Sequence, residues 1–314
     1  MTRNVIRIIT HRIWTGMLVL LAAQTVAFFA LRLTPGDPIA TLLGPQTNAS
    51  PGVRDRIAAD LGLDQPLWRQ YLRAVLEPLT GDLGHSYQLG QDVYSVLGDQ
   101  LWPTVQVTVG ATVLALLIAV PAALSTAGPA RRTRTLFSGA ELLAVSVPSF
   151  WLGLVLLTAF SFRIHLFPSA GDHGVASLVL PVLSLAVPMA GELGQVLRAT
   201  LDRTLEQPFI TTLRARGLSE PALRVRHVLR HGSLATATMT GWMVGTLLTG
   251  TMLVETLFGR PGIGRITVNA VVTKDFPVVN AVVLLAALLF VVINLAVDLL
   301  YLALDPRLRR SGHA

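Results

Sequence analysis

Side chains that could do chemistry are concentrated in one stretch of the sequence, between two long apolar runs. The stretch reads FITTLRARGLSEPALRVRHVLRHG, residues 209–232, and contains five arginines and two histidines. Such a basic segment suits contact with an anionic surface, and basic segments beside membrane spans commonly contact lipid headgroups. Its role therefore depends on the elements around it and on the side of the membrane that it faces.

Motifs of self-contained catalysis are missing from the sequence. A phosphate-binding loop needs a lysine after glycine, but the single lysine, Lys274, stands between Thr273 and Asp275. Neither H-E-x-x-H nor G-x-S-x-G occurs, and the segment 261–264 (PGIG) lacks the third glycine of a dinucleotide fingerprint. The chain has no cysteine, and its seven histidines are scattered. We therefore expect no catalytic residue, no metal site and no cofactor bound by this chain.

Composition places the chain in a membrane. Of its 314 residues, 52% are hydrophobic and only 14% are charged, which is unlike a soluble domain of this length. The formal net charge is +7, and all basic residues except Lys274 are arginine. On a membrane protein this charge does not indicate nucleic acid as a partner.

Six apolar stretches are long enough to cross the bilayer, which needs about 20 residues per helix. The first is too long for a signal peptide and no cleavage site follows it, so we expect it to remain as a span. Four prolines fall inside these runs. We expect each to kink its helix, which is tolerated where neighbouring helices or water satisfy the freed carbonyl groups. The expected spans are 13–33, 105–127, 141–162, 176–197, 234–258 and 278–304, and the prolines are Pro121, Pro148, Pro181 and Pro188.

Arginines set the orientation, because short basic loops stay in the cytoplasm. The segments 131–134, 198–230 and 307–310 are basic, whereas residues 34–100 carry four arginines against eight acids. Both termini are therefore expected inside and residues 34–100 outside.

Within the acidic segment a short cap is expected. Asp64 is placed to cap a helix from Pro66 to about Leu79, with one apolar stripe formed by Leu67, Tyr71, Val75 and Leu79. Such a helix could pack on the spans for stability alone, or it could be a platform for an external partner. The sequence leaves both interpretations open.

Carboxylates at membrane depth would mark a proton-coupled carrier, because they are costly there. Glu141, Glu255 and Asp298 lie near span ends, so Glu192 is the deepest candidate, with Arg198 six residues later. A structural ion pair or helix-end role is the alternative for Glu192.

The basic stretch itself predicts two helices separated by a sharp break. Pro208 suits the first turn of one helix, Gly217 suits the left-handed position after its end, and Ser219 suits the cap of the next. A short amphipathic helix is thereby presented on the arginine-rich side.

Several ordered blocks give the chain a family resemblance. The insert resembles the EAA loop of ABC-importer permeases, and more narrowly that of dipeptide, oligopeptide and nickel permeases, in the first permease of each pair. Matching blocks cover nearly the whole chain: 36–38, 42–44, 61–66, 81–87, 209–219, 226–235, 255–258, 261–264, 274–279, 298–301 and 305–307. Leu213 replaces the alanine of the family pattern, and Ala235 replaces its proline.

The resemblance implies an all-α polytopic membrane protein with six spans and an external helical cap between the first two. Its implied parts are an N-terminus with the first span (1–33), the cap (34–100), a five-helix core (101–304) with the coupling loop at about 198–233, and a cytoplasmic tail (305–314). The bacterial cytoplasmic membrane is the implied location.

The resemblance also implies sites and partners. The coupling residues would dock on a cytosolic ATPase subunit, and a second set would gate the path or receive an external binding protein. The implied coupling residues are Phe209, Ile210, Leu213, Arg214, Ala215, Arg216, Gly217, Leu218 and Ser219, and the outer set is Glu255, Pro261, Gly262, Gly264 and Asp275. Implied partners are a homologous permease, two ATPase subunits that bind ATP and Mg²⁺, the binding protein and membrane lipid.

Two other classes of protein remain possible. A self-sufficient channel or proton-driven carrier would need Glu192 in a cavity and would work without ATP. A membrane scaffold would keep the basic loop without moving any substrate. Within the resembled family the substrate also stays open between short peptides, nickel, glutathione and other small solutes.

Overall fold

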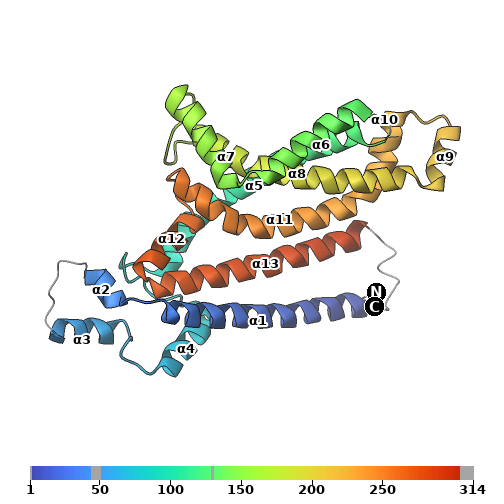
Figure 1. The fold of residues 1–314 in the computed structure, drawn as a ribbon. Helices are drawn as coiled ribbons and strands as arrows, with labels where there is room; N and C mark the ends of the chain where they lie inside the picture. Colours follow the sequence, from blue (N-terminus) through green and yellow to red (C-terminus); the bar gives the residue numbers. More distant parts are fainter. Residues whose placement is uncertain (1, 44–50, 129–130, 305–314) are drawn as a thin grey trace. The chain divides into compact units, whose positions relative to one another are not determined.

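The structure, a computed structural model, describes residues 2–43, 51–128 and 131–304. These residues form helices joined by turns, with a single isolated β-bridge between His85 and Asp92. The elements are α1 (Thr2–Leu33), α2 (Pro38–Leu43), α3 (Pro51–Asp60), α4 (Leu67–Leu76), η1 (Glu77–Thr80), α5 (Val93–Thr126), α6 (Arg131–Ser146), α7 (Ser149–Leu156), η2 (Leu157–Arg163), α8 (Ala176–Leu205), α9 (Pro208–Ala215), α10 (Glu220–Leu223), η3 (Arg224–Val228), α11 (Leu229–Leu257), α12 (Ile263–Thr273) and α13 (Phe276–Leu304) (Figure 1). The predicted all-α class is confirmed.

Four of these helices are long and apolar enough to cross a membrane. They are the segments 14–33, 93–126, 176–205 and 276–297. Two bent helix pairs, 134–146 with 149–163 and 236–247 with 250–257, raise the number to six if each pair is counted as one span. The six expected spans are therefore matched only when both bent pairs cross the membrane.

Pro148 breaks the third expected span, which was predicted as one helix over 141–162. The two halves meet at 98°. Proline lacks the N–H of a helical hydrogen bond and disfavours helical geometry in the residue before it. Pro148 itself is extended, with φ −60° and ψ 137°, and begins α7. By contrast, Pro181 and Pro188 lie within the continuous helix α8.

The described chain divides into two compact units. The first comprises residues 1–104 and 261–292, and the second comprises 105–260 and 293–314. In the first unit, the start of α5, α12 and the start of α13 share a core that includes Val93, Leu97, Ile263, Ala270 and Val278.

The expected cap helix has different bounds, and only part of its predicted apolar stripe is covered. The α-helix ends at Leu76 and continues as one 3₁₀ turn, and its N-cap is Pro66 without a side-chain cap, so the predicted role of Asp64 is wrong. Leu67 and Leu79 are exposed. Tyr71 and Val75 of the predicted stripe are half-buried, beside buried Gln70, and the Tyr71 ring contacts that of Phe28 of α1 at a centroid distance of 5.5 Å.

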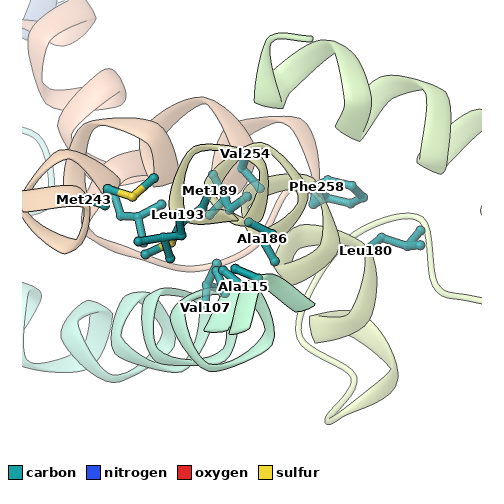
Figure 2. Packing of buried hydrophobic residues seen from close by; sticks show 14 of the residues in the cluster. Val107, Ala115, Leu180, Ala186, Met189, Leu193, Met243, Val254 and Phe258 are labelled. Atoms are coloured by element: carbon teal, nitrogen blue, oxygen red, sulfur yellow. The ribbon is translucent and has the colours of Figure 1, made fainter. Parts of the chain in front are cut away.

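In the second unit, small residues allow helices to approach closely. Ala111, Ala115, Ala119 and Ala123 repeat every four residues along α5 and are all at most 1% exposed. Small side chains at one face are typical of helix packing in membranes, where dispersion contacts replace the hydrophobic effect. Figure 2 shows side chains of α5, α8 and α11 meeting in this core, among them Ala115, Met189 and Val254.

Candidate functional site

The basic insert is a helix, a glycine elbow and a second helix, as its sequence predicts. α9 begins at Pro208, and Gly217 follows its end with φ +83°. Gly217 N–H donates to the Arg214 carbonyl (2.9 Å) and Leu218 N–H to the Leu213 carbonyl (3.3 Å). These are the two hydrogen bonds of a Schellman motif, which requires a left-handed residue. Ser219 is the N-cap residue of the next helix, but its side chain makes no capping bond.

An apolar cluster fixes the insert to the second unit. Ile210 of α9 and Leu223 of α10 are fully buried, together with Leu197 and Leu201 of α8 and Ala123 of α5. Leu213 packs against the same cluster, so the leucine that departs from the family pattern faces its own chain. The side chain of Ala235, the other departure, lies outside the described residues.

A half-buried polar contact adds to this anchor. The Arg224 guanidinium donates to the Leu124 carbonyl near the end of α5, at 3.1 Å. The apolar cluster and this contact together fix the insert to α5 and α8.

The opposite face of α9 is open. Phe209 is 37% exposed. Its ring lies 5.3 Å from that of His231, between centroids. Ala215, Arg216 and Gly217 are exposed as well. An exposed helix face held from behind by a buried isoleucine can contact another protein without unfolding.

An ion pair spans the elbow. Arg214 Nε lies 2.6 Å from Glu220 Oε1, so the two helices are linked across Gly217. The hydrogen bond from Arg214 holds the pKa of Glu220 below its ordinary value, and the carboxylate in turn raises the pKa of Arg214. Because both side chains are largely exposed, water and salt screen this pair strongly.

Residues of the predicted outer set are mostly buried and support their own chain. In the first unit, Gly262 N–H donates to the Gln100 amide oxygen at 2.7 Å, and the next N–H donates to Thr104 at 2.8 Å. These α5 side chains cap the start of α12. Gly264 is buried, and Pro261 is half-buried.

Asp275 fixes the segment that precedes α5. Its carboxylate accepts a hydrogen bond from the Ser86 hydroxyl and one from the Tyr87 N–H at 3.1 Å. Asp275 is 2% exposed. A carboxylate with several donors is a strong local tie, since charge-assisted hydrogen bonds exceed neutral ones in strength.

Lys274 forms a second tie that the sequence did not reveal. Its ammonium donates to the carbonyls of Thr34 (3.1 Å) and Pro35 (2.6 Å), which follow α1. A Cβ on Gly36 would lie 2.6 Å from the Lys274 Nζ, so the glycine leaves room for the ammonium. The neighbouring Lys274 and Asp275 thus connect α12 to two distant segments of the first unit.

The second unit has a buried arginine that sequence reasoning also missed. Arg260 is fully buried and donates to Asp172 (3.1 Å), Ser177 (3.0 Å) and Gln106 (2.9 Å). Glu255, five residues earlier, is 1% exposed and belongs to the same turn region through a backbone bond from Arg260 N–H to its carbonyl. The Arg260 cluster lies at the start of α8, and the insert lies at its end.

A structural ion pair was one alternative to a proton-coupled role for Glu192, but Arg198, the nearest arginine after it, is not its partner. Arg198 instead forms a buried ion pair with Glu141 of α6, behind Gly191 and Gly194, whose missing Cβ atoms leave space for Glu141. Glu192 is half-buried in the middle of α8. The side chain of Asp298 lies outside the described residues.

Within the described ranges, no three or more His, Asp or Glu side chains gather as a metal ion would require. The geometry is that of a helical chain with up to six candidate membrane spans, in which the short helix α9 is exposed on one face and anchored to α5 and α8 on the other. A membrane-spanning helical chain that presents a short anchored helix is the arrangement expected of the class of membrane transport permeases.

Comparisons with known proteins agree with this class. Residues 101–310 match the family described as binding-protein-dependent transport system inner membrane component, and residues 5–108 match the corresponding N-terminal family. The chain belongs to this family and is a non-catalytic, multi-pass component of the inner membrane. These matches confirm the prediction that the chain is an ABC-importer permease.

Full-length relatives lie within the same family. A peptide permease protein of Brucella suis is 33% identical over 97% of this chain and 99% of its own length. A glutathione transport system permease of Escherichia coli K12 is 32% identical over 92% of this chain and 94% of its own length. The methionine ABC transporter MetNI, solved in inward-facing conformations, shares the fold with a TM-score of 0.57 at 19% identity, covering 68% of this chain and 97% of its own.

Proposed function

We propose that this chain is one of two permeases in an ATP-driven importer, and that α9 is the contact through which separate ATPase subunits move it. The observation that carries the proposal is the exposed face of α9, held by buried Ile210 and ended by the Gly217 elbow. Closure of an ATPase pair on ATP would then favour one of two permease conformations over the other. ATP and Mg²⁺ belong to those partners.

The structure supports a division of roles within α9. Ile210 and Leu213 hold the helix to its own chain, so Phe209, Ala215 and Arg216 are the residues proposed to meet the ATPase. Arg214 is already paired with Glu220, and it stiffens the elbow. Gly217, Leu218 and Ser219 shape the turn between the helices.

The proposed topology places the insert and both termini in the cytoplasm and residues 34–100 outside as a helical cap. The arginine-rich loops support this orientation. The outer set of Glu255, Pro261, Gly262, Gly264 and Asp275 would then keep the external turns in shape for a gate or a binding protein, since most of its members are buried. The tail, residues 305–314, lies outside the described residues.

Short peptides are the proposed substrate class. Relatives named for peptide and for glutathione transport support it, and glutathione is itself a tripeptide. Nickel and other small solutes are the alternatives. Mass spectrometry of the ligand that co-purifies with the partner binding protein tests this assignment, and a bound metal ion without peptide would refute it.

A single cysteine can test the proposed contact, because the natural chain has none. Ala215→Cys places a small reactive side chain on the exposed face of α9. We expect it to cross-link to the ATPase subunit in native membranes. The control is Leu89→Cys, at an exposed position in the acidic segment.

The two variants should also differ in access. An impermeant thiol reagent added outside the cell membrane should label the Leu89→Cys variant and leave the Ala215→Cys variant unlabelled. Cross-links from position 215 to lipid alone, with the ATPase present, would overturn the proposed contact.

A further inference from the structure

One side of α4 is apolar and open. Trp68, Leu72 and Leu76 are spaced four residues apart, so they lie along the same side of the helix. Leu79 continues this row on the 3₁₀ turn that follows, three residues after Leu76. These four side chains, the exposed stripe, are each at least 43% exposed. A continuous row of large apolar side chains indicates an interaction surface.

The neighbouring side of α4 is charged. Arg69, Arg73 and Glu77 each follow a member of the exposed stripe by one residue, and all three are exposed. Arg73 Nε lies 3.7 Å from Glu77 Oε1. The Arg69 guanidinium lies 5.2 Å from the centroid of the Trp68 ring. The open surface of α4 is therefore divided lengthwise into an apolar and a charged half, which is typical of helices that lie in a membrane interface.

The remaining side of α4 packs on α1. The Tyr71 hydroxyl lies 2.8 Å from the Thr25 hydroxyl. The Gln24 amide nitrogen donates to the Ala74 carbonyl at 3.0 Å. Gln24 and Thr25 belong to the candidate membrane span 14–33, and polar side chains of this kind join helices within membranes. The contacts therefore place α4 beside a membrane span and not beyond its end.

The level of α4 follows from the charged residues of α1. No charged residue lies between Arg12 and Arg32, and their separation of about 30 Å matches the thickness of the hydrocarbon core. The Arg32 guanidinium lies 4.9 Å from the centroid of the ring of Phe276, the first residue of α13, so both helices end at the same level. Thr25 and Gln24 lie about 10 and 12 Å below Arg32. Contacts at these two residues therefore place α4 at membrane depth.

The two ends of α4 lie at different depths. Gln70 accepts a hydrogen bond from Arg32, at the charged end of α1. Ala74, one turn later on α4, accepts its bond from Gln24, two turns deeper on α1. α4 therefore slopes towards the middle of the membrane, and Leu76 lies deeper than Gln70.

The charged half of α4 borders a cavity. Arg73 and Glu77 line it together with Asp60 and Asp82, and its volume is about 380 Å³. A polar cavity of this size has room for water. Charged side chains are tolerated at membrane depth where they face such a cavity and not hydrocarbon. The charges of α4 are therefore compatible with its position beside the span.

The exposed stripe continues the apolar surface of α1. Phe29 and Leu33, one turn apart on α1, are exposed. The Phe29 ring stacks on the Tyr71 ring with centroids 6.0 Å apart. By helical periodicity, Tyr71 and Val75 lie between the contact with α1 and the exposed stripe. An unbroken apolar surface thus runs from a membrane span onto α4.

We propose that α4 lies in the membrane, in the leaflet at the C-terminal end of α1, with the exposed stripe against lipid acyl chains. Arg69 then extends towards the headgroups, as arginines beside an apolar surface do. The proposed topology makes this the outer leaflet, and only that name rests on the proposed function. α4 is in this case a lipid-facing arm of the first unit and not a platform for an external protein.

Single cysteines on α4 test the proposal, because the natural chain has none. Each variant of the full-length chain carries a nitroxide spin label and is placed in liposomes without partner subunits. Electron paramagnetic resonance then measures access of oxygen, which concentrates in lipid, and of nickel ethylenediaminediacetate, a neutral complex confined to water. We expect a high ratio of oxygen access to nickel access for Leu72→Cys and Leu76→Cys.

Glu77→Cys is the matched control, because Glu77 follows Leu76 directly and lies on the charged half. We expect the oxygen-to-nickel ratio to be at least about threefold higher for Leu76→Cys than for Glu77→Cys. The ratio should also be higher for Leu76→Cys than for Trp68→Cys, since the helix slopes inward. A detached or unfolded helix would give adjacent positions the same surroundings, so misfolding could not produce this contrast.

The other possible surroundings of the exposed stripe give different results. High nickel access for Leu72→Cys and Leu76→Cys would place the stripe in water and overturn the proposal. Low access of both reagents would mean that protein, such as a second copy of the chain, covers it, and would overturn the proposal as well. So would a loss of oxygen access in the complete transporter when its binding protein is added. Loss of the ATPase cross-link at position 215 would refute the proposed function and leave these accessibilities unchanged.

Discussion

Replacing Gly217 by valine tests whether the elbow transmits movement. A Cβ at Gly217 would meet nothing within 4 Å, so the new side chain causes no clash. The cost comes only from the backbone, whose φ is +83°. A residue with a Cβ loses about 1–2 kcal/mol in this left-handed region, and a β-branched one is the least tolerant.

That cost lowers the fraction of molecules in which the turn at Gly217 is formed, and it leaves the rest of the fold intact. About 1.4 kcal/mol is a factor of ten in an equilibrium constant, so α9 would often lose the two hydrogen bonds that end it at Gly217. The cluster around Ile210 would still hold the insert to the chain. We therefore expect normal membrane insertion, ATP hydrolysis close to wild type, and uptake reduced about tenfold per ATP hydrolysed.

The assay is uptake and ATP hydrolysis measured together, in liposomes that contain the complete transporter and its binding protein. Gly81→Val is the matched control, because Gly81 has φ +87° and equally open space in the acidic segment. Gly217→Asn should restore part of the coupling, since asparagine tolerates this backbone region. A wild-type ratio of uptake to ATP in Gly217→Val would refute the elbow mechanism, and equal uncoupling by Gly81→Val would show the effect to be general.

Three further outcomes follow from the contacts. Arg198→Met should lower the free energy of unfolding by about 3–5 kcal/mol by leaving Glu141 buried and unpaired, and adding Glu141→Leu should recover most of it in thermal unfolding in detergent. Lys274→Met should speed proteolysis between residues 34 and 60, whereas Lys274→Arg should preserve part of the contact. The hydrogen bond from Arg214 lowers the pKa of Glu220, so its stabilisation is complete above the ordinary glutamate value and is lost as the pH falls through the lowered pKa. The hydrogen-exchange difference between wild type and Glu220→Gln should hold from pH 8 to pH 5 and decrease as the pH falls below about 4.5.

Much of the insert could be predicted because its signals are local. Pro208 and Gly217 are residues with narrow backbone preferences, and they mark the start and end of α9 correctly. The side of α9 that faces the chain could not be read in the same way. Ile210, Leu213 and Phe209 are all apolar, and only tertiary packing separates the buried pair from the exposed ring.

Contacts between residues far apart in the chain could not be predicted either, because they too depend on tertiary packing. In the sequence Arg198 follows Glu192 by six residues, but its ion-pair partner is Glu141, 57 residues earlier. Prolines show the same limit, since Pro148 breaks a span while Pro188 stays within α8. Packing around a proline decides whether the helix continues, and a single sequence does not contain that information.

The length of α8 gives the anchored insert a mechanical advantage. Thirty residues make a rod of about 45 Å, with the insert at one tip and the Arg260 cluster at the other. A tilt of about 5° about one tip displaces the far tip by about 4 Å, which exceeds the reach of the hydrogen bonds that hold Arg260. A small rigid rotation of α8, caused at the insert, would therefore be enough to rearrange the hydrogen bonds of Arg260 at its other end without bending the helix.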